Sequence, residues 1–205
     1  MKKITIIIFL ILSQLNIFAQ ADNDDIRTIF KKKKGRTFIV AQKFQYTQLN
    51  TTSVFLVGAG GGTIFKHKFL LGGGGYGTIR GVPVKKEDFD KLNLTENISH
   101  SIHFGYGGFW TSYIFNWQSP FHIVAGMFWA GGGLSIKQND TNETVKSNFV
   151  YILQPMIELE LNINEFTRIS IAPEYRYVGN IKLEGYKSSD FSSFGIVFFI
   201  KFGAF

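Results

Sequence analysis

The sequence predicts an all-β fold, an eight-stranded antiparallel up-and-down transmembrane β-barrel. Only 18% of the 205 residues are charged and 16% are aromatic, whereas a soluble domain carries about 25% charged residues. Mean hydropathy is nevertheless only +0.06, which is typical of strands with an apolar outer face and a mixed inner face. From residue 37 onward, segments rich in Phe, Ile, Val, Tyr and Thr alternate with turn signals.

The first 20 residues have the pattern of a secretory signal peptide. Lys2 and Lys3 precede an apolar run from Ile4 to Leu12, and small residues follow in Ala19-Gln20-Ala21. The apolar run is shorter than the roughly 20 residues that a membrane-spanning helix needs. We therefore expect residues 1–20 to be cleaved from an exported protein.

Residues 21–36 differ in composition from the chain that follows. Acidic residues come first, and four lysines stand at positions 31–34. We expect a flexible periplasmic N-terminal segment whose lysines either contact anionic lipid or cell-wall polymer, or are simply solvated. The formal net charge of +7 does not indicate nucleic acid here, because an exported chain meets anionic lipid head groups instead. Residues 37–205 are expected to form the barrel.

Eight strands are expected in this part of the chain. They cover residues 37–48, 53–65, 69–80, 101–115, 121–137, 146–163, 167–181 and 193–204. Tight turns follow the second, fourth and sixth strands, and longer polar loops follow the third, fifth and seventh. The connection after the first strand, at residues 49–52, is shorter than this pattern prefers. Short turns at one end and long loops at the other are the layout of an outer-membrane barrel, and closure leaves no strand edge in lipid.

The sixth and seventh strands show the clearest alternation of apolar and polar side chains. Their apolar faces hold Tyr151, Leu153, Pro155, Ile157, Leu159 and Leu161, and Ile169, Ile171, Pro173, Tyr175 and Tyr177. Their opposite faces carry the charged residues Glu158, Glu160, Arg168, Glu174 and Arg176. Unpaired charge is costly in lipid, so we expect these five residues to point inward as a polar network in the lumen. A structural polar core is the favoured interpretation, and a gate or a proton path is the alternative.

Other strand positions carry further expectations. Ile196, Phe198, Ile200 and Phe202 should face outward and Lys201 inward. Pro155 and Pro173 lie inside strands, where proline removes a ladder hydrogen bond, so a β-bulge is expected at each.

The three tryptophans, Trp110, Trp117 and Trp129, should supply aromatic girdles at the two membrane interfaces. A ligand pocket is the alternative role for them.

Residues that could carry chemistry are few. The glycine clusters at residues 58–62 and 72–75 neither open a helix nor precede Lys-Ser/Thr, so they indicate strand bends rather than phosphate binding. The chain has no cysteine, and its four histidines lack metal-ligand spacing. Ser101 and His103 share a strand face and could serve a lipid hydrolase, but no acidic partner is evident. No catalytic, cofactor or metal residue is therefore predicted, and the chain is not expected to be an enzyme.

The leader, the eight strands, the loop alternation and the C-terminal FGIVFFIKFGAF resemble small eight-stranded outer-membrane β-barrel proteins of Gram-negative bacteria. The terminal Phe205 is similar to the assembly signal that such proteins present to the barrel assembly machinery. The stretches LGGGGYG, FGYGGFW, ELELNI and PEYRYV resemble an uncharacterised Bacteroidota set of these barrels. The resemblance implies a place in the cell outer membrane, in contact with outer-membrane lipids and lipopolysaccharide.

Three functions agree with these observations. The first is a structural or surface-interaction role through extracellular loops, with no open pore, because side chains just fill an eight-stranded barrel. The alternative is the binding or passage of a small hydrophobic ligand, and the lower alternative is a lipid-modifying outer-membrane enzyme. A soluble secreted barrel would need a polar outer face, which the last three strands do not offer.

Overall fold

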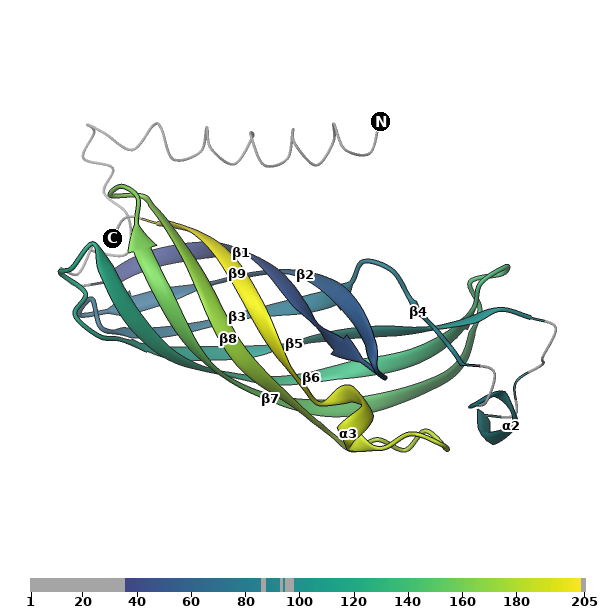
Figure 1. The fold of residues 1–205 in the computed structure, drawn as a ribbon. Helices are drawn as coiled ribbons and strands as arrows, with labels where there is room; N and C mark the ends of the chain where they lie inside the picture. Colours follow the sequence, from purple (N-terminus) through teal and green to yellow (C-terminus); the bar gives the residue numbers. More distant parts are fainter. Residues whose placement is uncertain (1–35, 86–87, 93, 95–97, 204–205) are drawn as a thin grey trace, which may run out of the picture. The chain divides into compact units, whose positions relative to one another are not determined.

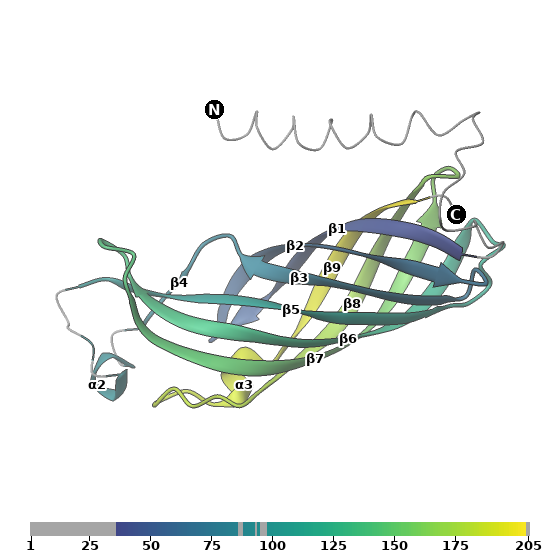
Figure 2. The same cartoon turned by 180° about the vertical axis from the view of Figure 1, so that it is seen from behind.

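The computed structural model describes residues 36–85, 88–92, 94 and 98–203, and these form a closed antiparallel β-barrel (Figures 1 and 2). Its eight long strands are β1 (Arg36–Leu49), β2 (Thr52–Phe65), β3 (Phe69–Thr78), β5 (His100–Ile114), β6 (Phe121–Gln138), β7 (Thr144–Asn162), β8 (Thr167–Gly179) and β9 (Ser193–Gly203). A short strand, β4 (Val82–Pro83), and two short helices, α2 (Phe89–Leu92) and α3 (Ser188–Phe191), lie in the connections. The predicted leader, the 21–35 segment and Phe205 lie outside the described residues.

The eight long strands pair with their neighbours in chain order, including β3 with β5, which bypasses the short β4. One further pairing, of β1 with β9, closes the barrel, as Figure 1 shows. Each predicted strand agrees with its observed bounds to within two residues. The predicted eight-stranded up-and-down barrel is therefore confirmed.

The barrel has two unlike ends. The turns at residues 66–68, 115–120 and 163–166 lie at one end, here called the turn end, together with the start of β1 and the end of β9. The connections at residues 79–99, 139–143 and 180–192 lie at the other end, here called the loop end. The remaining connection at the loop end is a two-residue turn, in which Asn50 and Thr51 both have positive φ, 47° and 66°.

The outer face of the barrel is apolar and the inner face mixed, because side chains alternate along each strand. On β7, Tyr151, Ile157 and Leu159 are exposed while Glu158 and Glu160 are buried. Further exposed apolar residues include Phe38, Val40, Phe44, Phe55, Leu71, Phe109, Phe121, Ile123, Phe149, Ile171 and Ile196. This arrangement is the reverse of a soluble domain and suits a barrel surrounded by hydrocarbon.

Glycines line much of the inner wall formed by β2, β3, β5 and β6. Gly60 pairs with Gly74 across β2 and β3, and Gly74 pairs in turn with Gly108 on β5. A Cβ atom on Gly60 would lie 3.1 Å from the Nζ atom of Lys43. The glycine clusters therefore leave room for side chains from other strands.

The expected bulges at Pro155 and Pro173 are wrong. The pairs between β7 and β8 are discontinuous beside both prolines, but the register is the same on either side. The registers of β6 with β7 and of β8 with β9 continue past the prolines and hold both strands in place. A register shift occurs instead between Ile136 and Lys137.

The helices α2 and α3 have four residues each. Among the residues that the structure describes, no helix has the length and apolar character needed to cross a membrane.

Candidate functional site: the lumen and its loop-end cap

A cluster of ionic side chains fills the lumen near the turn end. Glu160 on β7 accepts from Arg168 Nη1 at 2.9 Å and lies 2.8 Å from His122 Nε2. Lys201 on β9 donates to both Glu160 and Glu158. All five residues are buried, so each carboxylate has a cationic partner away from bulk solvent.

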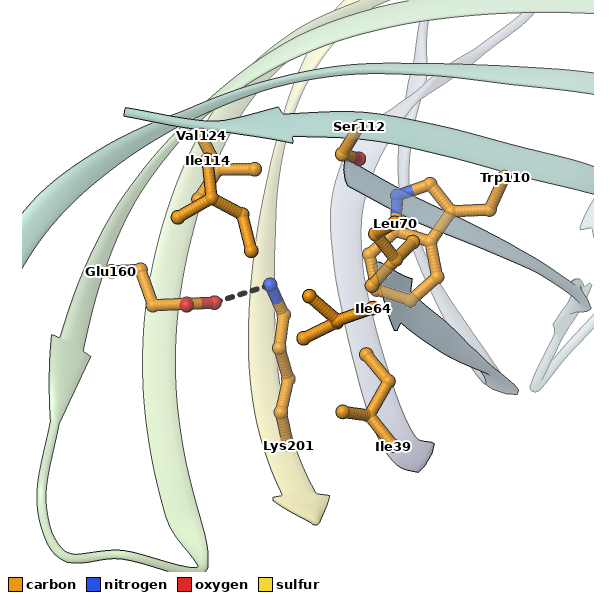
Figure 3. A pocket seen from close by; sticks show the side chains of 9 residues that line it. All are labelled: Ile39, Ile64, Leu70, Trp110, Ser112, Ile114, Val124, Glu160 and Lys201. Carbon is orange, nitrogen blue, oxygen red and sulfur yellow. Dashed lines mark hydrogen bonds and ion pairs between the residues drawn. The ribbon is translucent and has the colours of Figure 1, made fainter. Parts of the chain in front are cut away.

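Apolar side chains surround this cluster, as Figure 3 shows. Lys201 and Glu160 point toward each other beside Ile64 and Leu70. The cavity that these residues line encloses about 10 Å³, which is room for about one water molecule. Side chains therefore leave little free space around this ion cluster.

The middle of the lumen holds a second lysine in a different setting. The Nζ atom of Lys43 lies 4.4 Å from the ring centre of Trp110, 5.0 Å from that of Phe128 and 5.1 Å from that of Tyr76. Lys43 is only 1% exposed, and no salt bridge joins it to a carboxylate among the described residues. Cation–π attraction therefore supports this buried charge.

Polar side chains in the part of the lumen nearer the loop end, here called the upper lumen, form a second network. Glu174 accepts from the side-chain amides of Gln45 and Gln154. The Tyr106 hydroxyl lies 2.9 Å from Oε1 of each of these glutamines and can donate to one of them at a time.

Arg176 ties the upper lumen to the loop end. Its Nη2 atom donates to the backbone oxygen of Gln48 at 2.7 Å, and its Nε atom donates to that of Phe191 at 3.2 Å. Phe191, the last residue of α3, is fully buried. The helix α3 thus packs over the barrel mouth and is held there by an arginine from the wall.

A small apolar cluster joins two loops at the loop end. Tyr186 stacks edge-on against Phe191 at 5.5 Å, and its hydroxyl donates to the Asp88 carboxylate at 3.3 Å. Burial and the nearby Asp88 carboxylate raise the pKa of Tyr186 above its usual value, so the hydroxyl keeps its proton and remains a donor. Phe89 and Leu183 are also buried.

The five residues of the predicted lumen network are all buried inside the barrel. Arg168 bonds Glu160, and Lys201 bridges Glu160 to Glu158, which also accepts from Ser170. The remaining two serve other partners: Glu174 bonds glutamines, and Arg176 bonds backbone oxygens and the Ser193 hydroxyl.

Sequence reasoning missed two lumen residues, Lys43 and His122. Alternation could have placed Lys43, because it shares a face with Ile39, Ala41 and Gln45, opposite Phe38, Val40 and Phe44.

The predicted girdle role of Trp110 is wrong. Trp110 is fully buried in the lumen, where its ring stacks on Phe199 at 5.7 Å. Segment 101–115 is apolar on both faces, so alternation could not tell which face was inner. Trp129 is 50% exposed on the outer face, whereas Trp117 stacks on His67 at the turn end, with ring centres 4.4 Å apart.

Ser101 and His103 do meet, with Ser101 Oγ 3.1 Å from His103 Nε2. No carboxylate bonds His103 among the described residues, and the charged group that interacts with it is the cation Lys137. A hydrolytic triad needs a third group that orients the histidine, and the described part of the chain offers this pair none. In the part of the chain described, no group of three or more His, Cys, Asp or Glu residues could hold a metal ion.

Comparisons with known proteins agree with this architecture. No protein-family model matches the chain, and a search of curated proteins finds no similar sequence. Among solved structures, Neisserial surface protein A is 13% identical with a TM-score of 0.54, over 83% of this chain and 97% of that one. The attachment invasion locus protein Ail of Yersinia pestis is 11% identical (TM-score 0.48, 83% and 99% covered), and the N-terminal β-barrel domain of Pseudomonas aeruginosa OprF is 9% identical (TM-score 0.48, 80% and 96% covered). The chain therefore has the fold of the small eight-stranded outer-membrane β-barrels.

Proposed function

We propose that this chain is an integral outer-membrane protein that acts at the cell surface through its loop end, without an open pore and without catalysis. The observation that carries the proposal is the reversed polarity of the barrel. Exposed apolar side chains cover the outer face, and charged side chains such as Glu158, Glu160 and Lys201 are buried inside. Such a surface is stable only in hydrocarbon.

The unlike ends support an orientation. Short turns face the periplasm and long loops face outward in barrels of this kind. The loop end would then present the β6–β7 connection at residues 139–143 and the 180–187 segment to the exterior. Their polar residues would meet lipopolysaccharide or a macromolecular partner, and Phe205 would serve the barrel assembly machinery on the periplasmic side. Membership of the Bacteroidota set remains part of this proposal.

The contents of the lumen support the absence of a pore. The ion cluster around Glu160 and Lys201 occupies the turn end, Lys43 and its aromatic rings occupy the middle, and Arg176 holds α3 at the mouth. Eight strands leave an interior that side chains just fill. The same contents argue against passage of a hydrophobic molecule through the lumen.

Two measurements test this proposal. An epitope tag inserted at residues 139–143 should be detected by antibody on intact cells, whereas the same tag at residues 163–166 should be detected only after the outer membrane is opened. The purified barrel in a planar lipid bilayer should give no stable conductance steps. Surface detection of the 163–166 tag would reverse the orientation, and steady conductance would contradict the closed lumen.

One observation favours the second candidate function, binding of a small hydrophobic ligand. A groove of about 370 Å³ opens on the barrel wall near the loop end, and ligand sites typically measure about 300–1,000 Å³. The lipid-modifying function is not favoured, because His103 has no acidic partner among the described residues.

A further inference from the structure

The barrel wall has a notch at its loop end, where β2 and β3 separate. β3 pairs with β2 only as far as Thr78 opposite Leu56, and a single bond follows, from Ile79 N–H to the Phe55 oxygen at 3.4 Å. The chain then runs to β4, which pairs with β5 instead, and this segment diverges from the β1–β2 hairpin in Figure 1. Thr52 to Phe55 consequently have a strand partner on the β1 side only.

The notch is the groove of about 370 Å³ described above, whose size lies in the range of about 300–1,000 Å³ for ligand sites. Its lining consists of Thr52, Ser53, Val54, Phe55, Ile79, Arg80, Gly81, Val82 and Pro83. Phe55 and Ile79 are 61% and 63% exposed, and they sit on the outer face of the barrel. The apolar wall of the notch is therefore open to the surroundings of the barrel.

The polar part of the lining favours an anion. Arg80 is exposed there, and none of the nine lining residues is acidic. Phe55 directs its carbonyl toward β3, and backbone groups two residues apart point to the same side of a strand. The N–H of Ser53 therefore points into the notch, beside Arg80 and the hydroxyls of Ser53 and Thr52.

One cation lies behind the notch, and the carboxylate of the neighbouring α3 is bonded within its own helix cap. Gly81 packs directly on Ser101 and His103, since a Cβ atom at position 81 would lie 2.7 Å from His103 Nε2. Lys137 is close enough to interact with His103. The Asp190 carboxylate, on the neighbouring α3, accepts from the backbone N–H of Lys187 in its own helix cap.

We propose that the notch binds one anionic lipid of the surrounding leaflet. The acyl chain would lie against Phe55 and Ile79, and the phosphate of the head group would be held by Arg80 and the Ser53 N–H. The acyl chain alone does not favour the notch over the bulk bilayer, because the surrounding lipid is equally apolar. Selectivity comes from the head group, through charge-assisted hydrogen bonds to a guanidinium. This inference names the ligand for the second candidate function and rests on the membrane location proposed above.

Native mass spectrometry of the detergent-solubilised full chain tests the site, with phosphatidylglycerol as the anionic probe and phosphatidylcholine as the zwitterionic one. The wild-type protein should retain one phosphatidylglycerol in preference to phosphatidylcholine. Arg80→Gln should lower that preference about fivefold, which corresponds to the ~1 kcal/mol that one basic residue contributes beside anionic lipid. Ser53→Trp, which fills the notch, should remove the retained lipid of either kind.

Lys182→Gln is the matched control, because Lys182 is an exposed cation of the loop end that does not line the notch. It should leave lipid retention unchanged. Unchanged preference in Arg80→Gln, or unchanged retention in Ser53→Trp, would overturn the proposal. A dimer that Ser53→Trp dissolves would also overturn it, since the occupant would then be a second copy of the chain.

Gel mobility of unheated samples separates this inference from the proposed function. Every variant should keep the mobility of the folded barrel. If the wild-type chain itself shows no folded form in detergent, the membrane assignment fails, and the lipid result then has no bearing on the notch.

Discussion

Two buried lysines of the lumen keep their charge in different ways. Lys201 bonds the carboxylates of Glu158 and Glu160, whereas Lys43 is enclosed by aromatic rings and forms no salt bridge in the described part of the chain. Removing one partner of a buried ion pair leaves the other charge uncompensated. Lys43 forms no salt bridge in the described part of the chain, so its removal leaves no carboxylate without a bonded cation. Substitution by methionine should therefore destabilise the barrel much more at position 201 than at position 43.

Lys201→Met should destabilise the barrel strongly, by about 3 kcal/mol, because two buried carboxylates lose their shared cation. Urea unfolding of the barrel in lipid vesicles, followed by tryptophan fluorescence, measures the free energy of unfolding. A decrease of less than about 1 kcal/mol in the free energy of unfolding is typical of exposed ion pairs. That result would contradict a buried ion cluster around Glu160.

Lys43→Met should change the free energy of unfolding by less than about 1.5 kcal/mol, because methionine has a similar volume and avoids the cost of burying a charge. Lys43→Met, measured in the same unfolding assay, is the matched control for Lys201→Met. A destabilisation as large as that of Lys201→Met would mean that Lys43 has an essential anionic partner.

Sequence could place some lumen residues and not others for a simple reason. Alternation identified the inward face of segments 146–163 and 167–181, because only one face there is apolar. Trp110 lies on a strand that is apolar on both faces, so alternation gives no direction there. The aromatic partners of Lys43 lie on β3, β5 and β6, far from it in the chain. A local sequence pattern therefore could not predict that these rings surround Lys43.

At the scale of elements, the turns at the loop end differ in strain and length. Thr51 adopts φ 66° in the two-residue turn between β1 and β2. A β-branched residue in this conformation is strained. The strain is local, because strand pairing resumes at once with Leu49 opposite Thr52.

Thr51→Gly should stabilise the barrel by about 1 kcal/mol, since glycine adopts positive φ without the clash that costs other residues ~1–2 kcal/mol. Thr63→Gly, inside β2, is the matched control and should destabilise. The free energy of unfolding in vesicles distinguishes the two. A destabilising Thr51→Gly would mean that the threonine side chain contributes more than its backbone strain costs.

The α3 helix depends on Arg176, which donates to the backbone oxygens of Phe191 and Gln48. Arg176→Met should release the 180–192 connection and increase its cleavage by added protease in intact vesicles, while the strands remain protected. Lys182→Met, at an exposed position of the same connection and outside α3 and its cap, is the control and should leave the cleavage rate unchanged. Equal cleavage rates in wild type and Arg176→Met would show that the cap holds without the arginine.

The strands were predictable from sequence because period-two alternation and turn residues mark them, and loop length marks the two ends. The elements inside the long connections were not. β4 has only two residues, and α2 and α3 have four each, so no periodicity can develop in them. The notch arises from where β3 ends and β4 begins, and it is invisible in the sequence for the same reason.

The whole molecule joins an apolar outside to a filled inside that mixes apolar and charged side chains. The lumen is blocked at the turn end by the Glu160 cluster, in the middle by Lys43 and its rings, and at the loop end by α3. Closure of the barrel through β1 with β9 leaves the long strands without a free edge over most of their length. Function is then expected at the surface, in the loops and in the notch, rather than through the interior.

Membrane fractionation combined with electrophoresis of boiled and unboiled samples tests the central claim most directly. A folded transmembrane barrel resists unfolding in detergent until it is heated, so the chain should be recovered with the outer membrane and should change mobility on boiling. Recovery as a soluble periplasmic or extracellular protein with one mobility would contradict the membrane barrel.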